Sequence, residues 1–233
     1  MVLIWKRTQF IGILIVTTLI LITLSVLTKI STFVLGHGNL LGLIPKFDMD
    51  KEANIPTLFN SLLLAISGVL FFIQHNSKKL DDPLHERKRI LILGVVFSYM
   101  ALDEITSLHE LLINPLREVF DFSGAFHFSW VVVGLLVVAL FLVYFIPFFL
   151  KKPRAVQIGL SLAGFLYVGG ALGIEMLGGA YASAYGELNL TYGLITTIEE
   201  SFELFGIIVL INILINELIQ HQGLASVRID ISE

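Results

Sequence analysis

Residues 127–150 read HFSWVVVGLLVVALFLVYFIPFFL, an almost unbroken run of apolar side chains. A helix of roughly 20 such residues is long enough to cross the hydrocarbon core of a bilayer. Five other stretches share this character, so the sequence predicts six membrane-spanning helices, at about residues 9–29, 57–75, 90–113, 127–150, 155–180 and 191–217. We therefore expect an all-α, polytopic membrane helix bundle in which residues 1–233 form a single transmembrane domain.

The overall composition agrees with a membrane protein and excludes several other classes. Hydrophobic residues make up 56% of the chain and charged residues only 15%, against about 25% in soluble domains. The net charge is −4 and the basic residues form no dense stripe, so nucleic acid is not expected as a partner. The chain has no cysteine, which excludes disulfides, thiolate metal sites and iron–sulfur clusters.

The distribution of basic residues predicts the orientation, because lysine and arginine of short loops are retained on the cytoplasmic side. With six spans, one side of the membrane holds Lys6, Arg7, Lys78, Lys79, Arg87, Lys88, Arg89, Lys151, Lys152, Arg154 and Arg228. The other side holds only Lys46, Lys51 and Arg117. We therefore expect both termini in the cytoplasm and loops 30–56, 114–126 and 181–190 outside.

Three of the predicted spans carry acidic residues, and one of them also a histidine, away from their ends. These residues are Asp103, Glu104, His109 and Glu110 in the third span, Glu175 in the fifth, and Glu199, Glu200 and Glu203 in the sixth. At a rise of about 1.5 Å per residue, all three groups reach the middle or outer half of the membrane. Glu104 and His109 are about 140° apart on a regular helix, so both can face one point only if the helix is distorted.

A cluster of carboxylates at this depth needs a neutralising partner. Each uncompensated carboxylate costs on the order of 2.5 to 3.5 kcal/mol at the bilayer centre. The same depth offers no lysine or arginine, only His109 and, at the outer edge of the fourth span, His127. Three explanations remain open, namely a bound metal, protons retained on the carboxyl groups, or a water-filled vestibule that opens outward.

Oxygen ligands with one or two imidazoles and no sulfur suit Fe, Mn, Zn, Mg or Ca. Carboxylates on facing helices also build di-iron sites, although the Glu-x-x-His motif of those sites is absent here. We therefore predict a divalent metal centre with the candidate ligands Asp103, Glu104, His109, Glu110, Glu175, Glu199, Glu200 and Glu203.

Three local patterns lead to further expectations. Asp48, Asp50 and Glu52 alternate as in a calcium loop, but Ala53 replaces the glycine that an EF-hand requires, so we interpret the stretch as a solvated loop. Asn54 is predicted to cap the helix that follows it. The GxxxG motif at Gly169 and Gly173, GGALG, is interpreted as a packing motif. Pro115 is expected to close the third span.

Taken together, FDMDKEANIPT at residues 47–57, LDE at 102–104 with HE at 109–110, and EE at 199–200 resemble a group of bacterial multi-pass membrane proteins of unknown activity. The resemblance covers roughly residues 40–205. It implies the fold class and localisation in a bacterial inner or plasma membrane. It implies nothing about a reaction.

Several functions are compatible with these patterns. We expect foremost a metal-dependent membrane protein whose centre opens toward the outer leaflet, and an enzyme on a lipidic substrate is one form of it. A proton- or cation-coupled transporter is the first alternative, although Glu217 is the only ionisable group expected in the inner half of the polar path. The second alternative is an accessory subunit that docks another membrane protein, or a homo-oligomer.

Overall fold

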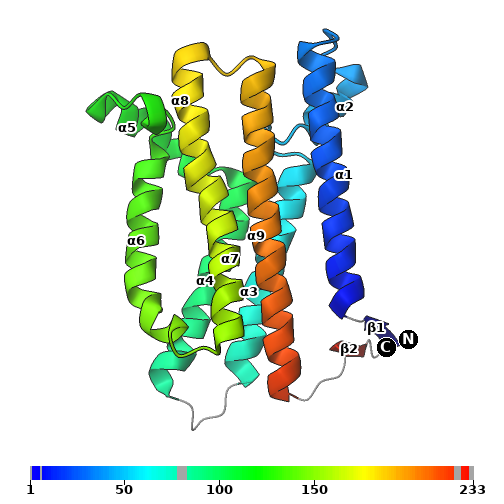
Figure 1. Ribbon diagram of the computed structural model, residues 1–233, viewed down its shortest axis with the longest axis vertical. Helices are drawn as coiled ribbons and strands as arrows, with labels where there is room; N and C mark the ends of the chain where they lie inside the picture. Colours follow the sequence, from blue (N-terminus) through cyan, green and yellow to red (C-terminus); the bar gives the residue numbers. More distant parts are fainter. Residues whose placement is uncertain (1, 6, 78–82, 223–226, 231–233) are drawn as a thin grey trace.

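The computed structural model describes residues 2–5, 7–77, 83–222 and 227–230. Its long helices run side by side along the long axis (Figure 1). They are α1 (Arg7–Phe33), α3 (Ile55–Ser77), α4 (Leu84–Thr106), α6 (Trp130–Phe149), α7 (Arg154–Val168), α8 (Glu175–Tyr185) and α9 (Leu190–Gln222). The basic residues Lys6, Lys78 and Lys79, which entered the orientation argument, lie outside the described residues.

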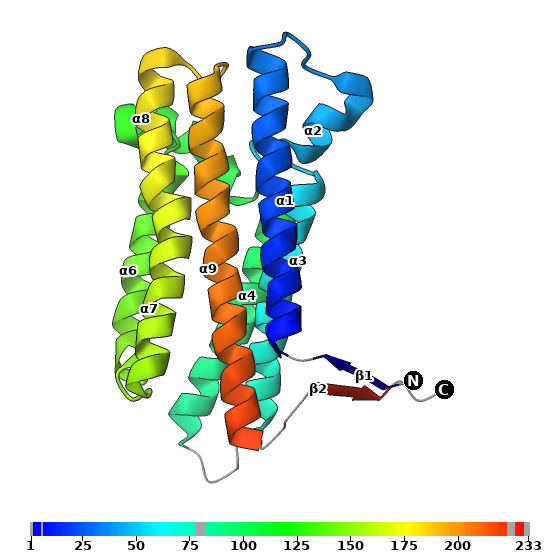
Figure 2. The same cartoon turned by 45° about the vertical axis from the view of Figure 1, so that its right-hand side comes forward.

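Short elements connect these helices or lie near the chain ends. They are η1 (Leu40–Gly42), α2 (Leu43–Phe47), η2 (His109–Leu112), α5 (Ile113–Phe120), η3 (Gly124–Phe126) and a π-helical segment, η4 (Gly169–Ile174). Strands β1 (Val2–Trp5) and β2 (Val227–Asp230) pair in an antiparallel ribbon beside the lower end of the bundle (Figure 2). The fold is helical apart from this ribbon, which the all-α prediction did not include.

The described residues contain five helices that are long and apolar enough to cross a membrane. Four of them, α1, α3, α6 and α9, coincide with predicted spans, and the fifth runs from α7 through η4 to α8. A sixth is obtained if α4 is joined to the segment His109–Phe120, from which it is bent by 73°. The third predicted span is therefore not one continuous helix.

The break in the third span lies at Ser107, so the prediction of a helix to residue 113 closed by Pro115 was wrong. Helix α4 ends at Thr106, and Ser107 has left-handed backbone angles with φ +48°. The Ser107 amide donates a hydrogen bond of 2.6 Å to the carbonyl oxygen of Asp103, which closes the last turn. Pro115 instead lies inside α5, after the chain has turned away.

Helix α9 is the centre of the bundle, where it packs against α1, α3, α7 and η4. The half of α9 that follows Glu203 is buried on nearly every side, as expected of a core helix with few polar residues. The residues that seal this half are Leu204, Ile207, Ile208, Ile211, Leu214 and Ile215, with Leu63 and Leu64 of α3 against them. The acidic residues of α9 are therefore Glu199, Glu200 and Glu203 on one side of this apolar segment and Glu217 on the other.

Candidate functional site

The carboxyl groups of α8 and α9 meet where the π-helical segment ends. Glu175 is the first residue of α8, directly after η4, and its side chain contacts that of Glu199. Trp130, at the start of α6, donates a hydrogen bond of 3.0 Å from Nε1 to Oε1 of Glu175. Two neighbouring carboxylates repel each other, so a proton or a cation held between them would stabilise the pair.

A second pair of carboxyl groups comes from α4 and α9, and a buried amide lies between them. Glu104 and Glu203 are neighbours, and the side chain of Asn60 from α3 lies next to both. Asn60 is 1% exposed, and neither its Oδ1 nor its Nδ2 has a hydrogen-bond partner among the described residues. The amide is therefore flanked by two carboxyl groups and can turn toward either of them or toward a ligand held between them.

Asp103 holds the histidine of the site in place. Its Oδ2 lies 2.8 Å from Nδ1 of His109, and its Oδ1 accepts the backbone amide of His109 at 3.0 Å. The imidazole packs edge-on against Trp130, with ring centroids 4.6 Å apart. Because Nδ1 is engaged by a carboxylate, Nε2 is the nitrogen that remains for a ligand. The break at Ser107 makes this arrangement possible, since it turns the chain back toward Asp103.

The remaining acidic residues of α9 complete this group. Glu199 and Glu200 are half-buried and Glu203 is buried. Gly170 lets η4 approach α9 closely, because a Cβ atom at Gly170 would lie 2.8 Å from the carbonyl oxygen of Glu199. The close contact is therefore made by Gly170 and not by the two glycines of the predicted GxxxG motif. Cβ atoms at Gly169 or Gly173 would meet nothing within 4 Å. We call the group the acidic centre, formed by Asp103, Glu104, Glu175, Glu199, Glu200 and Glu203 with His109, Asn60 and Trp130.

Two further acidic residues lie at the edge of the acidic centre. Glu110, a predicted ligand, is exposed. Glu52 is also exposed, but its carboxylate lies next to Ser107 and near His109 and Glu110. Sequence reasoning left Glu52 out, although it belongs to the stretch that carried the resemblance. Asn60 and Trp130 were missed as well, and nothing in their local sequence distinguishes them from ordinary helix residues.

Glu52 belongs to a loop that enters the bundle, so the interpretation of a solvated loop was wrong. We call residues 48–54 the clamp loop. Lys29 of α1, whose side chain is 2% exposed, forms ion pairs with Asp48 at 2.5 Å and Asp50 at 3.2 Å. Burial raises the pKa of Asp50, an effect that the Lys29 charge opposes. The chain enters at this point because α1 carries a buried cation that needs acidic partners.

Backbone contacts hold the clamp loop at both ends. The amide of Met49 donates to Oγ of Ser25 at 3.2 Å, and Ser25 lies 3.1 Å from the hydroxyl of Thr197 on α9. At the other end, Oδ1 of Asn54 accepts the amide of Thr57 at 2.9 Å. This contact confirms Asn54 as the N-cap of α3. The loop therefore lies at the depth of Thr197, close above Glu199.

The second histidine considered from sequence lies outside the acidic centre. Nε2 of His127 is 3.2 Å from Oε1 of Glu187, in the loop between α8 and α9. Its backbone carbonyl accepts a hydrogen bond from Arg117 of α5. His127 thus joins α5 to the loop between α8 and α9 and does not cap the carboxyl groups.

The acidic centre has little positive charge opposite it. Within the described ranges, none of the ion pairs formed by lysine or arginine involves Glu104, Glu175 or the glutamates at 199, 200 and 203. The same residues contain no group of three or more histidine, aspartate and glutamate side chains already spaced to hold a metal ion. The predicted ligands therefore come together as pairs with Asn60 and Trp130 between them, and the structure contains no formed coordination shell in this part of the chain.

Comparison with known proteins identifies the family. Residues 9–216 match the family described as "Domain of unknown function (DUF8692)", and the chain belongs to that family. The matched range includes every residue of the acidic centre and the clamp loop. No curated protein and no solved structure matches the chain.

Proposed function

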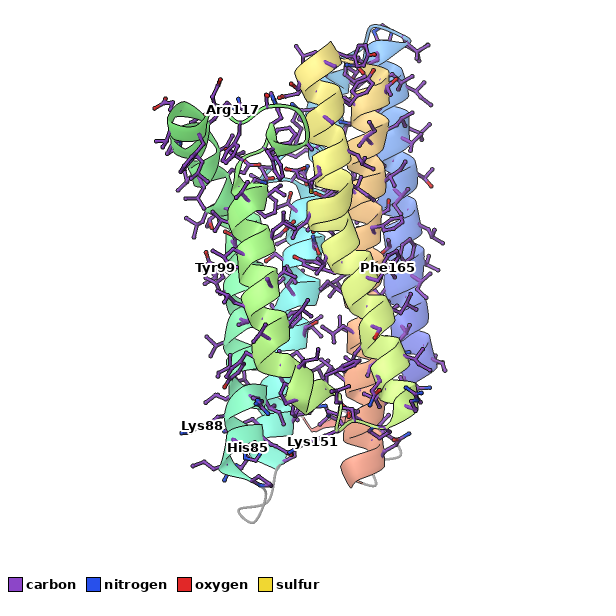
Figure 3. All side chains as sticks on the ribbon, turned by 60° about the vertical axis from the view of Figure 1, so that its left-hand side comes forward. His85, Lys88, Tyr99, Arg117, Lys151 and Phe165 are labelled. Atoms are coloured by element: carbon purple, nitrogen blue, oxygen red, sulfur yellow. The ribbon has the colours of Figure 1, made fainter. Side chains whose placement is uncertain are left out.

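We propose that the chain is an integral protein of a bacterial inner or plasma membrane, crossing it six times with both termini in the cytoplasm. The five apolar helices and the bent pair support this number of spans. The distribution of charge supports the orientation, because His85, Lys88 and Lys151 lie at one end of the bundle and Arg117 at the other (Figure 3). The end with Arg117 is then the outer one, and it is the end nearer to the acidic centre.

We propose further that the acidic centre binds a divalent metal ion. The observation that carries this proposal is the meeting of Glu104 from α4 and Glu203 from α9 beside the buried amide of Asn60, without an ion pair to lysine or arginine among the described residues. Oxygen donors with one imidazole suit Mg, Mn, Fe, Zn or Ca. Glutamate side chains rotate about several bonds, so the present pairs can turn toward a bound cation.

A lipidic substrate is the class of ligand that fits this position. Asp103, Glu104 and His109 lie where α4 ends, beside the exposed apolar side chains of Leu102 and Ile105. A molecule dissolved in the membrane can therefore reach the edge of the centre from the side. A metal held there would polarise an ester or amide carbonyl, and a carboxylate not bound to the metal would serve as base. This is the enzymatic form of the proposal.

The transporter alternative has weaker support. Between Glu203 and Glu217, α9 presents buried apolar residues that pack against α3, and the polar residues Asn212 and Asn216 there carry no charge. Glu217 itself is engaged, since its carboxylate pairs with Lys152 at 2.7 Å and accepts a hydrogen bond from Gln74 at 3.3 Å. These contacts favour a site that communicates with one side of the membrane.

The proposal is tested by removing one carboxylate. Glu203→Gln should lose bound metal in elemental analysis and should lower Tm, because a ligand at about 100 times its Kd stabilises the folded state by about 2.7 kcal/mol. Chelation of the wild type should have the same effect. Glu118→Gln, at an exposed position of α5, is the matched control and should keep both metal and Tm. Equal stability of wild type, variant and chelated protein, with no stoichiometric metal in any, would refute the proposal.

A further inference from the structure

The acidic residues around the centre are graded in exposure from the surface inward. Glu52 and Glu110 are exposed, Asp103 and Glu104 are half-buried, and Glu203 is 8% exposed. The series is continuous, because Glu52 has the strongest electrostatic effect of the charged residues on Glu104, and Glu104 has the strongest on Glu203.

The innermost step of this series carries an independent sign of a ligand. The side chain of Asn60 is 1% exposed and lies between Glu104 and Glu203, and its two polar atoms have no hydrogen-bond partner within the described residues. A carboxamide offers an oxygen to a cation, as carboxylates do. The acidic series therefore ends at a buried polar group directed into the centre.

The structure also restricts the direction from which a cation arrives. Beyond Glu203, toward the inner end, the next buried residues of α9 are Leu204, Ile207 and Ile208, which belong to the apolar core. Toward the outer end, Glu52 is held at the surface by the clamp loop, whose position the buried Lys29 determines through Asp48 and Asp50. Only the outer direction in this region is lined by charged groups.

We propose that Glu52 and Glu110 form the mouth through which the acidic centre takes up its divalent cation from the outer side. This inference rests on the proposed function, because it requires that the centre binds a cation at all. Glu52 and Glu110 attract the cation and pass it to Glu104, and the clamp loop keeps Glu52 in place. Charges at such a rim act mainly on the association rate and its salt dependence.

The test varies the charge at the mouth within one protein preparation. The chain has no cysteine, so Glu52→Cys can be modified at that position alone, with a methanethiosulfonate that carries either a trimethylammonium or a sulfonate group. We expect the trimethylammonium adduct to lower the Mn²⁺ association rate about threefold to tenfold relative to the free thiol, from Coulomb repulsion of a divalent ion at close range in water. The sulfonate adduct should raise the rate, and reduction should restore the thiol value. High salt should diminish all three differences.

Two controls separate the possible failures. Glu187→Cys, in the outer loop beside His127, should show no dependence on the adduct, whereas Glu110→Cys should reproduce the series at the second rim position. If wild type binds Mn²⁺ but the association rate does not depend on the charge at residues 52 and 110, the proposed mouth is refuted and the proposed metal centre is not. If wild type binds no Mn²⁺ and elemental analysis finds no other divalent metal, the proposed function fails and the mouth fails with it.

Discussion

Asp103 shows how a single residue changes its role between sequence and structure. By type and depth it was a candidate metal ligand, but both of its carboxylate oxygens are used on His109, one on the ring and one on the backbone amide. A carboxylate in this position orients an imidazole so that the opposite nitrogen faces the ligand. Asp103 is therefore a positioning residue, and His109 is the stronger ligand candidate. The pairing depends on the turn at Ser107, which helical periodicity does not reveal.

Gly170 gives a prediction at the same scale. Gly170→Ala should lower stability by about 1 to 3 kcal/mol, because the new methyl group would lie 2.8 Å from a backbone oxygen of α9 and the helices would have to separate. Gly169→Ala and Gly173→Ala are matched controls, since a Cβ atom there meets nothing within 4 Å. They should be neutral or stabilising by up to about 1 kcal/mol. Thermal unfolding of the three variants in one detergent measures this, and equal losses would contradict the close contact.

The clamp loop and α1 depend on each other as elements. Lys29 is a buried cation on a helix whose one other charged residue is Arg7, and the clamp loop supplies the two carboxylates that neutralise it. Each element needs the other to be buried, because the lysine or the aspartates, if unpaired, would carry a desolvation penalty. The sequence places these residues about 20 positions apart, with nothing in the local pattern to connect them. The structure therefore makes an outer loop part of the bundle.

Removing the cation should destabilise the protein strongly. Lys29→Met is expected to cost about 3 to 5 kcal/mol, because it leaves the buried Asp48 without its partner. Adding Asp48→Asn and Asp50→Asn should recover part of the loss, since no uncompensated charge would remain. Lys51→Met, at an exposed position of the same loop, is the control and should change little. A triple variant no more stable than Lys29→Met would argue against ion pairing as the cause.

At the scale of the whole molecule, the bundle is asymmetric along its axis. Its inner half is sealed by the apolar residues of α9 and α3, with Glu217 and Lys152 paired at the inner end. Its outer half holds the acidic centre, the clamp loop and the bent segment η2–α5. This division favours a site that works from one side of a membrane over a conduit through it.

The orientation leads to a labelling prediction. Cysteines at the exposed positions Gly38 and Leu188 should react with an impermeant thiol reagent on intact cells, because both lie at the end that we assign to the outside. Leu188 is preferable to Asn189, whose side chain caps α9 through the amide of Tyr192. Ser77→Cys, at the opposite end, should react only after permeabilisation. The reverse pattern would invert the assignment of sides.

Sequence alone determined where the long apolar helices lie and which acidic residues they carry. That success has a local cause, since a run of about 20 apolar residues indicates a span without reference to any other part of the chain. Tertiary structure alone decided the break at Ser107, the contacts of Asn60 and Trp130 with the carboxyl groups, and the ion pairs of the clamp loop with Lys29. Each of these depends on contacts between helices far apart in the chain, and the charge of one element is compensated by another only once both are packed.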